Sequence, residues 1–141
     1  MAITFHNQGV AFHLKEKNRH RAWIRRSIED HGRDAGNIAF IFTSNEDLLK
    51  MNKAYLNHNH FTDVITFDYT DDDLISGDVF ISVDQVRINA SHYGVDEGAE
   101  LRRVMIHGVG HLMGYGDVTS EEKKEMRKLE EEALHLWLKE V

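Results

Sequence analysis

The sequence predicts a single α+β domain over residues 1–141, in which a small mixed β-sheet of about four strands packs with roughly four to five helices. Strand-like and helix-like patterns alternate through the first half of the chain, whereas helical patterns fill the last third. The 141 residues contain no proline and no internal repeat, and they are enough to bury a sizeable core. These observations together favour one ordinary domain.

The first predicted elements are two strands with a helix between them. Ile3–Asn7 alternates apolar and polar residues and predicts an edge strand, and the apolar run at 37–43 predicts a buried strand. The segment 14–31 predicts a helix that ends near Gly32, because its apolar residues share one helical face: Trp23, Ile24 and Ile28.

Five further elements follow along the chain. Ser44 with Asp47 three residues later is a helix-start pattern, and the apolar stripe after it is Leu48, Met51 and Tyr55. Residues 63–69 and 77–83 predict two strands joined by an acidic segment. The next helix carries the stripe Leu101, Val104, Met105, Gly108 and Leu112. Thr119-x-x-Glu122 is a helix-start pattern and predicts a last helix. The charged residues at 121–132 are expected on its solvent face. Its inner apolar stripe is Met126, Leu129, Ala133, Leu136 and Trp137.

Composition limits the functions that fit this chain. The formal net charge of −7 argues against a general nucleic-acid coat protein, because phosphate contacts need cations. No apolar run approaches the roughly 20 residues of a membrane span, and no secretory leader pattern is present, so we expect a cytoplasmic protein with no membrane partner. Since the chain has no cysteine, any zinc ligand must be a histidine or a carboxylate.

Basic residues are concentrated between positions 15 and 26, where Glu16 is the only acid. Three arginines of this segment, Arg21, Arg25 and Arg26, are candidate contacts for a polyanion such as RNA. The alternative is that this helix face is simply solvated.

The segment HGVGHLMGYGD, residues 107–117, has the spacing of a metal site. His107 and His111 are four residues apart, so on a helix they lie about 40° apart on one face. Gly114 is a natural point for the helix to end and the chain to turn back. That turn places Asp117 as a candidate third ligand. An ordinary polar pair on the helix surface is the alternative for the two histidines.

Two glycines inside the same helix support a special environment. Gly108 and Gly110 each cost roughly 1 kcal/mol relative to alanine in a helix. Two such residues within one turn indicate that something comes close to this backbone, either a neighbouring element or a substrate.

These residues resemble the H-G-x-L-H-L-x-G-Y-D-H signature of the YbeY endoribonuclease family, also called rRNA maturation factors. Two upstream segments extend the likeness. MNKAYLNHNHFTDVITF at 51–67 resembles the family pattern L-N-x-x-Y-R…T-D-V-L-S-F, and GDVFIS at 77–82 resembles G-D-I-x-I-S. The resemblance implies a zinc-dependent hydrolase that cuts single-stranded RNA and helps to mature ribosomal RNA in the cytoplasm. It also implies the ribosome or ribosomal proteins as candidate partners.

The sequence departs from the family pattern at its ligands. His107 and His111 match the first two zinc-binding histidines, but the third is here Asp117 and the residue before it is Gly116. The leucine between the first two ligands is here Gly110. A carboxylate ligand lowers the charge of the site from about +2 to about +1, which makes the metal a weaker Lewis acid. Two histidines and a carboxylate also suit Fe(II), so another divalent metal is the alternative to zinc.

The substrate contacts are also altered. The family arginine after the tyrosine is here Leu56, which removes one cation for a phosphate. Arg102 and Arg103, shortly before His107, or the arginines of the 15–26 segment are candidate replacements. In the loop that follows Leu56, His58 and His60 are candidates for carrying a proton, and a plain surface loop is the alternative.

The sequence leaves three functions open. The first is a metal-dependent endoribonuclease of rRNA maturation, in which zinc-bound hydroxide attacks a phosphodiester. The second is a zincin-like hydrolase of another substrate, against which the missing glutamate after His107 argues. The third is a catalytically weakened factor that binds the ribosome or rRNA, which Leu56 and Asp117 favour. The sequence identifies no general acid or base beyond the candidates His58 and His60.

Overall fold

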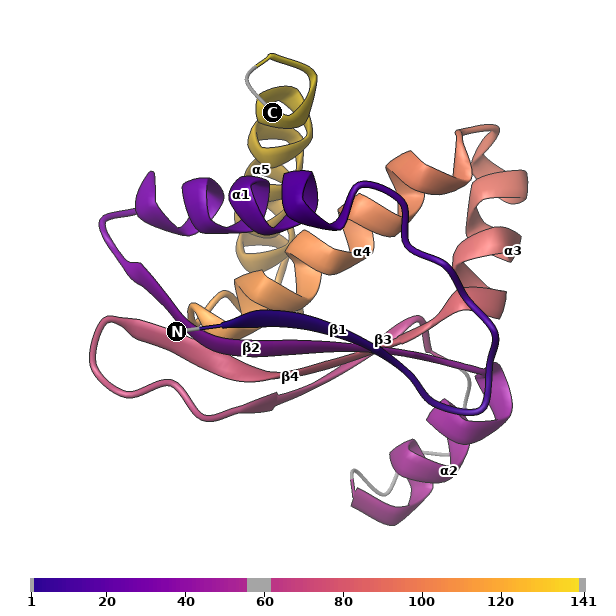
Figure 1. Cartoon of the computed structure of the whole chain (residues 1–141). Coiled ribbons are helices and arrows are strands. Elements are labelled where there is room, and N and C mark those ends of the chain that lie inside the picture. Colours follow the sequence, from indigo (N-terminus) through magenta and orange to yellow (C-terminus); the bar gives the residue numbers. More distant parts are fainter. Residues whose placement is uncertain (1, 56–61, 140–141) are drawn as a thin grey trace.

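The computed structural model describes residues 2–55 and 62–139, and in them the chain forms one mixed β-sheet of four strands and five helices (Figure 1). In chain order the elements are β1 (Ile3–Asn7), α1 (Lys17–Glu29), β2 (Asp34–Thr43), α2 (Asn45–Tyr55), β3 (Val64–Asp68), β4 (Leu74–Ser82), α3 (Val83–Tyr93), α4 (Glu97–Leu112) and α5 (Ser120–Lys139). The predicted α+β class, with its mixed sheet of about four strands and up to five helices, is therefore confirmed.

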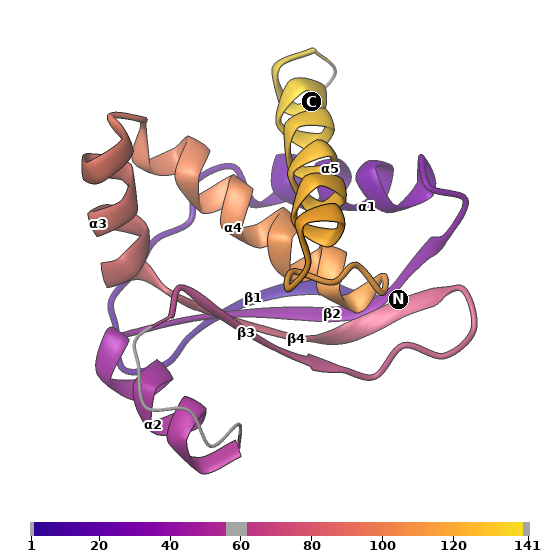
Figure 2. The same ribbon diagram turned by 180° about the vertical axis from the view of Figure 1, so that it is seen from behind.

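The sheet has the strand order β1-β2-β4-β3. β1, β2 and β4 run parallel, and β3 pairs antiparallel with β4 at one edge. Helices α1, α4 and α5 lie on one side of the sheet, whereas α2 lies at its end on the opposite side (Figures 1 and 2). The core fills the layer between sheet and helices, where the largest side chains of the stripe on α1 and of β2 are fully buried: Trp23, Ile24, Ile28, Phe40 and Phe42.

Two predicted helix starts are present as local hydrogen bonds. At the start of α5, the Glu122 amide donates to Oγ1 of Thr119 at 3.1 Å, and the Thr119 amide donates to Oε1 of Glu122 at 2.9 Å. This is the reciprocal capping box that the spacing predicts. At the start of α2, the amide of Asp47 donates to Oγ of Ser44 at 3.2 Å. These signals are readable in sequence because every partner is within a few residues.

The structure also contains a helix that the sequence patterns did not predict. In α3 the buried stripe is short, with only Val83, Val86 and Ala90 facing inward, so its periodicity is weak. Its ends are nevertheless well marked, because Oγ of Ser82 accepts from the Gln85 amide at 3.1 Å and Gly94 ends the helix at φ 65°. α1 is shorter than predicted, and β2 and β4 each begin three residues before their predicted starts.

The two glycines of α4 allow neighbouring elements to approach. A Cβ at Gly108 would lie 2.6 Å from Cγ1 of Val79 on β4, and a Cβ at Gly110 would lie 2.7 Å from Sδ of Met126 on α5. Of the two explanations that the sequence left open, close packing of a neighbouring element is therefore the one observed. α4 consequently lies close to the sheet on one side and close to α5 on the other.

Candidate metal centre

The end of α4 brings the three predicted ligands together. His107 and His111 point from one face of α4, and the chain turns at Gly114, where φ is 95°. Asp117 lies in the segment that leads to α5. One ligand atom from each of these three residues lies within 4.8 Å of the others. The predicted group of His107, His111 and Asp117 is thus assembled by a helix and the turn that follows it.

Hydrogen bonds determine which imidazole nitrogens carry protons. Nδ1 of His107 is 2.7 Å from Oε2 of Glu130, and Nδ1 of His111 is 3.0 Å from the backbone carbonyl oxygen of Tyr115. A carbonyl oxygen only accepts, and an ionised carboxylate only accepts, so both Nδ1 atoms donate. In the neutral rings, both Nε2 atoms therefore present a lone pair, which is the form that binds a metal.

The lone pairs converge on one point. Nε2 of His111 is 3.1 Å from Nε2 of His107, which is 3.2 Å from Oδ2 of Asp117. Three electron-rich atoms this close repel one another unless a cation or a proton lies between them. Ligand atoms around a four-coordinate zinc ion are themselves about 3.3 Å apart, given Zn–N bonds of about 2.0–2.1 Å. The donor set and its spacing therefore fit a zinc ion.

The electrostatics of the two rings differ. Burial alone would lower the pKa of His107, but the hydrogen bond and charge of Glu130, together with Asp117 and Asp63, outweigh burial and raise that pKa. Burial and the neighbouring His107 lower the pKa of His111. The charged form is therefore favoured for His107, the ring beside the carboxylates, and the neutral form is favoured for His111.

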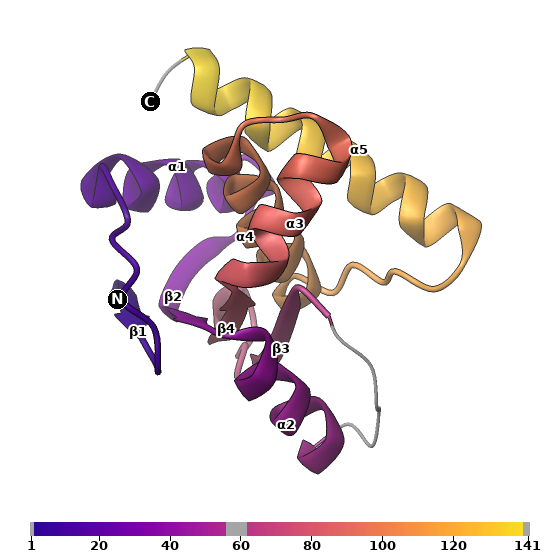
Figure 3. The ribbon, with the colours of Figure 1, turned by 90° about the vertical axis from the view of Figure 1, so that its right-hand side faces the viewer.

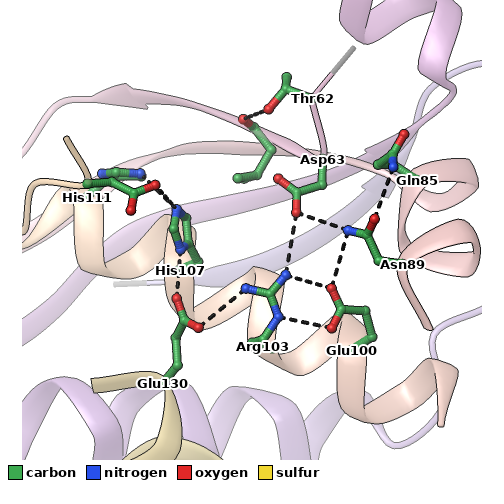
Figure 4. Close-up of polar contacts among 11 residues, drawn as sticks. Thr62, Asp63, Gln85, Asn89, Glu100, Arg103, His107, His111 and Glu130 are labelled. Carbon is green, nitrogen blue, oxygen red and sulfur yellow. Dashed lines mark hydrogen bonds and ion pairs between the residues drawn. The ribbon is translucent and has the colours of Figure 1, made fainter. Parts of the chain in front are cut away.

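A carboxylate and guanidinium network holds His107 in place (Figure 4). Glu130 of α5 is only 8% exposed and also contacts Nη1 of Arg103 through Oε1 at 3.3 Å. Nη2 of Arg103 donates to Oε2 of Glu100 at 2.6 Å and lies 3.6 Å from Oδ2 of Asp63, before β3. Asn89 of α3 donates to the carboxylates of Asp63 and Glu100 at 3.3 and 3.4 Å. Four elements or their flanking turns therefore support one imidazole.

Glu130 is the residue of the candidate site that the sequence patterns missed. It belongs to the charged run 121–132, which was expected on the solvent face of the last helix, and that expectation is wrong for this position. It is buried because it lies four residues after Met126 and one after Leu129, on the inner face of α5. Arg103 and the Nδ1 proton of His107 offset the cost of burying its charge. Its place on the apolar stripe was the available signal.

The predicted arginines occupy different surroundings. Arg103 is fully engaged in the network, and the hydrogen bond to Glu100 raises its pKa despite burial. Arg102 stacks over the Trp137 ring, 4.2 Å from its centroid, away from the metal centre. Arg21 donates to the backbone oxygen of Ile3 and to Asn18, and Arg26 pairs with Asp30. None of the α1 arginines, Arg21, Arg25 and Arg26, lines the cavity that contains His107 and Asp117.

Three positions named in the sequence prediction, Leu56, His58 and His60, lie outside the described residues. Within the described ranges, the helices include none that is both long and apolar enough to cross a membrane.

The fold and the site together define a class: an α+β domain that presents two histidines and a carboxylate of one helix–turn unit for a metal ion. Residues 4–137 match the family model described as Endoribonuclease YbeY. The chain therefore belongs to the YbeY family.

Relatives of known name are similar over nearly the whole chain. The Endoribonuclease YbeY of Bacteroides thetaiotaomicron is 42% identical over 134 residues, which are 95% of this chain and 98% of that protein. The Endoribonuclease YbeY of Flavobacterium psychrophilum is 40% identical over 93% of this chain and 94% of its own length. The solution structure of TM1509 from Thermotoga maritima has a TM-score of 0.65 over 97% of this chain and 92% of that chain at 22% identity, which shows a shared fold.

Proposed function

We propose that this protein is an endoribonuclease that cuts single-stranded RNA during ribosomal RNA maturation, with one zinc ion held by His107, His111 and Asp117. The observation that carries the proposal is the convergence of two Nε2 lone pairs and a carboxylate, with both Nδ1 protons donated elsewhere. The name Endoribonuclease YbeY carried by relatives about 40% identical supports the reaction. Membership of the family supports an action in the cytoplasm on ribosomal RNA, with ribosomal proteins as candidate partners.

Zinc is the metal that the donor set favours. Imidazole nitrogens and a carboxylate oxygen are ordinary zinc ligands, and two histidines with one carboxylate occur in catalytic sites that keep a fourth position open. When bound, the ion would supply a Lewis acid for a phosphoryl oxygen and would make a water molecule more acidic. The side chain of Asp117 is 41% exposed, so the open side of the centre faces solvent and an incoming RNA strand.

The residues around the ligands orient the two imidazole rings. Glu130 holds the proton of His107 at Nδ1 and thereby directs Nε2 to the metal position. Arg103 holds Glu130 through an ion pair of 3.3 Å and offsets the cost of burying that carboxylate. The carbonyl oxygen of Tyr115 does the same for His111, since it accepts from that ring's Nδ1. Both rings are therefore oriented before metal or RNA arrives.

The direct test is cleavage of a labelled single-stranded RNA by the zinc-loaded protein, beside His111→Ala purified in the same way. We expect cleavage by the wild type and none by the variant, because the variant lacks one of three ligands. Equal cleavage by both would assign the activity to a contaminating nuclease. No cleavage by either, with one zinc bound per wild-type chain, would contradict the proposal and favour a factor that only binds RNA.

A further inference from the structure

A cavity of about 560 Å³ extends from the metal centre along the outer side of α4. His107 and Asp117 line it at the metal centre, Tyr93 and Val95 line it from the end of α3, and α5 supplies most of the remaining lining. Figure 3 shows α3, α4 and α5 at this end of the molecule, on the helical side of the sheet. The cavity is much larger than a metal ion and its ligands require, so it has room for part of a substrate.

Two cations of α5 line this cavity, and among the residues that the structure describes neither forms an ion pair. Lys123 and Arg127 are exposed and are spaced four residues apart, so they lie about 6 Å apart along one face of the helix. No ion pair joins either side chain to a carboxylate within the described ranges. The third cation of the lining, Arg103, is by contrast already held by Glu100 and Glu130. Lys123 and Arg127 are therefore the cations of this cavity that remain available to a phosphate.

The charge of the cavity depends on the metal. Four carboxylates and three cations line it, so with a neutral His107 the lining carries a net charge of −1, and one divalent ion changes this to +1. The carboxylates are Glu100, Asp117, Glu130 and Glu131. A polyanion is therefore repelled by the metal-free cavity and attracted by the loaded one. Loading of the metal and binding of RNA should accordingly be coupled.

An aromatic side chain stands at the far end of the cavity. Tyr93, the last residue of α3, is 65% exposed although it lines the cavity. An exposed ring beside cations is the usual combination for single strands, in which bases stack on aromatic rings while the backbone follows positive charge.

We infer that the cavity between α3 and α5 is the single-strand binding groove of this enzyme, in which Lys123 and Arg127 bind the RNA backbone and Tyr93 stacks one base. The inference rests on the proposed endoribonuclease function and adds its substrate contacts. These three residues are substrate-positioning groups, since they lie beside the metal ligands and not among them. Stacking on Tyr93 requires a base face that no neighbouring base covers, so a paired duplex should be a poor ligand.

The chain offers a matched control for the two cations. The double variant Lys123→Gln/Arg127→Gln removes two charges that line the groove, whereas Lys124→Gln/Lys128→Gln removes two charges one position further along the same helix, outside the lining. The readout is the Kd of the zinc-loaded protein for a labelled single-stranded phosphorothioate RNA, which keeps its backbone charges and resists cleavage, from anisotropy at several salt concentrations. We expect the first double variant to lower the slope of log K against log salt by about 1.4, because each single-strand phosphate contact contributes about 0.7. At 0.1 M salt this corresponds to binding about 25-fold weaker.

The outcomes are distinct. A lower slope in the groove variant and an unchanged slope in the control supports the inference. Two unchanged slopes would overturn it, because neither pair of cations would then contact RNA phosphates. Two equally lowered slopes would also overturn it, because the contribution to RNA binding would then come from the overall positive charge of α5. Removal of zinc with a chelator should also weaken RNA binding by the wild type, and unchanged binding would refute the coupling. A wild type that binds RNA without cutting it would contradict the proposed function alone, since the binding comparison stays valid.

Tyr93 has its own comparison. Tyr93→Ala should weaken binding by about 5- to 150-fold, the range observed when one stacked base loses its ring, whereas Tyr93→Phe should bind like the wild type. Tyr69 is an equally exposed tyrosine, at 62%, that does not line the groove, and Tyr69→Ala serves as the control. Steady-state cleavage should show the loss in KM and not in kcat. If Tyr93→Ala and Tyr69→Ala bind alike, stacking on Tyr93 is excluded.

Discussion

Replacement of Glu130 tests whether the network around His107 serves the metal. Glu130 comes from α5, accepts the Nδ1 proton of His107 at 2.7 Å and is 8% exposed. Glu130→Ala removes the acceptor and the charge together, whereas Glu130→Gln keeps an oxygen acceptor and removes only the charge. Arg103 keeps its contacts to Glu100 and Asp63 in both variants, so the guanidinium is not left unpaired.

The expected loss follows from the role of such partners. A carboxylate that holds a ligand histidine fixes the ring and raises its basicity, and its removal costs about 10- to 100-fold in metal affinity. This corresponds to about 1.4–2.7 kcal/mol of binding free energy. Glu130→Ala should fall in this range and Glu130→Gln should lose less. The stabilisation of the fold by a fixed excess of zinc should decrease by the same free energy.

Zinc affinity is measured by competition with a chromophoric chelator, and stability by urea unfolding with and without zinc. Glu131→Ala is the control, because it makes the same change one residue along α5, whereas the hydrogen bond to Nδ1 of His107 comes from Glu130. If Glu130→Ala and Glu131→Ala bind zinc with equal affinity, the reasoning is refuted, and Glu130 is only a structural partner of Arg103.

Three further predictions concern other parts of the molecule. Asp117→Ala should lose both bound zinc and RNA cleavage, as measured by metal content after dialysis and by gel; retention of both would remove Asp117 from the ligand set. Gly108→Ala should destabilise the fold by about 1–3 kcal/mol in urea unfolding, since its Cβ would meet a stiff valine of β4. Gly110→Ala should destabilise the fold less, because the neighbours of its Cβ are the flexible ends of Met126 and Leu129. Equal losses of stability in the two variants would refute this distinction. Burial lowers the pKa of His20, whose Nε2 has no hydrogen-bond partner among the described residues, so protonation favours the unfolded chain. The free energy of unfolding should therefore fall as pH decreases below about 6.5, the pKa of unfolded histidine, more steeply in the wild type than in His20→Phe; parallel profiles would contradict this sign.

The sequence by itself determined the fold class, most of the elements and the three metal-binding candidates. These features are local, because the spacing of His107 and His111, the turn at Gly114 and the capping box of Thr119 and Glu122 all involve residues a few positions apart. Periodicity failed where few residues are buried, as in α3, whose inner face has three buried residues.

The tertiary structure alone decided what surrounds the ligands. Glu130 lies 23 residues from His107, and Asp63 lies 40 residues from Arg103, so no spacing rule connects them. Their contacts exist because α4 packs closely against both the sheet and α5, through glycines that leave no side chain in the way. The sequence contains the candidate ligands of the metal centre as a local pattern, whereas the supporting carboxylates and the cavity arise only from the packing of the elements that carry them.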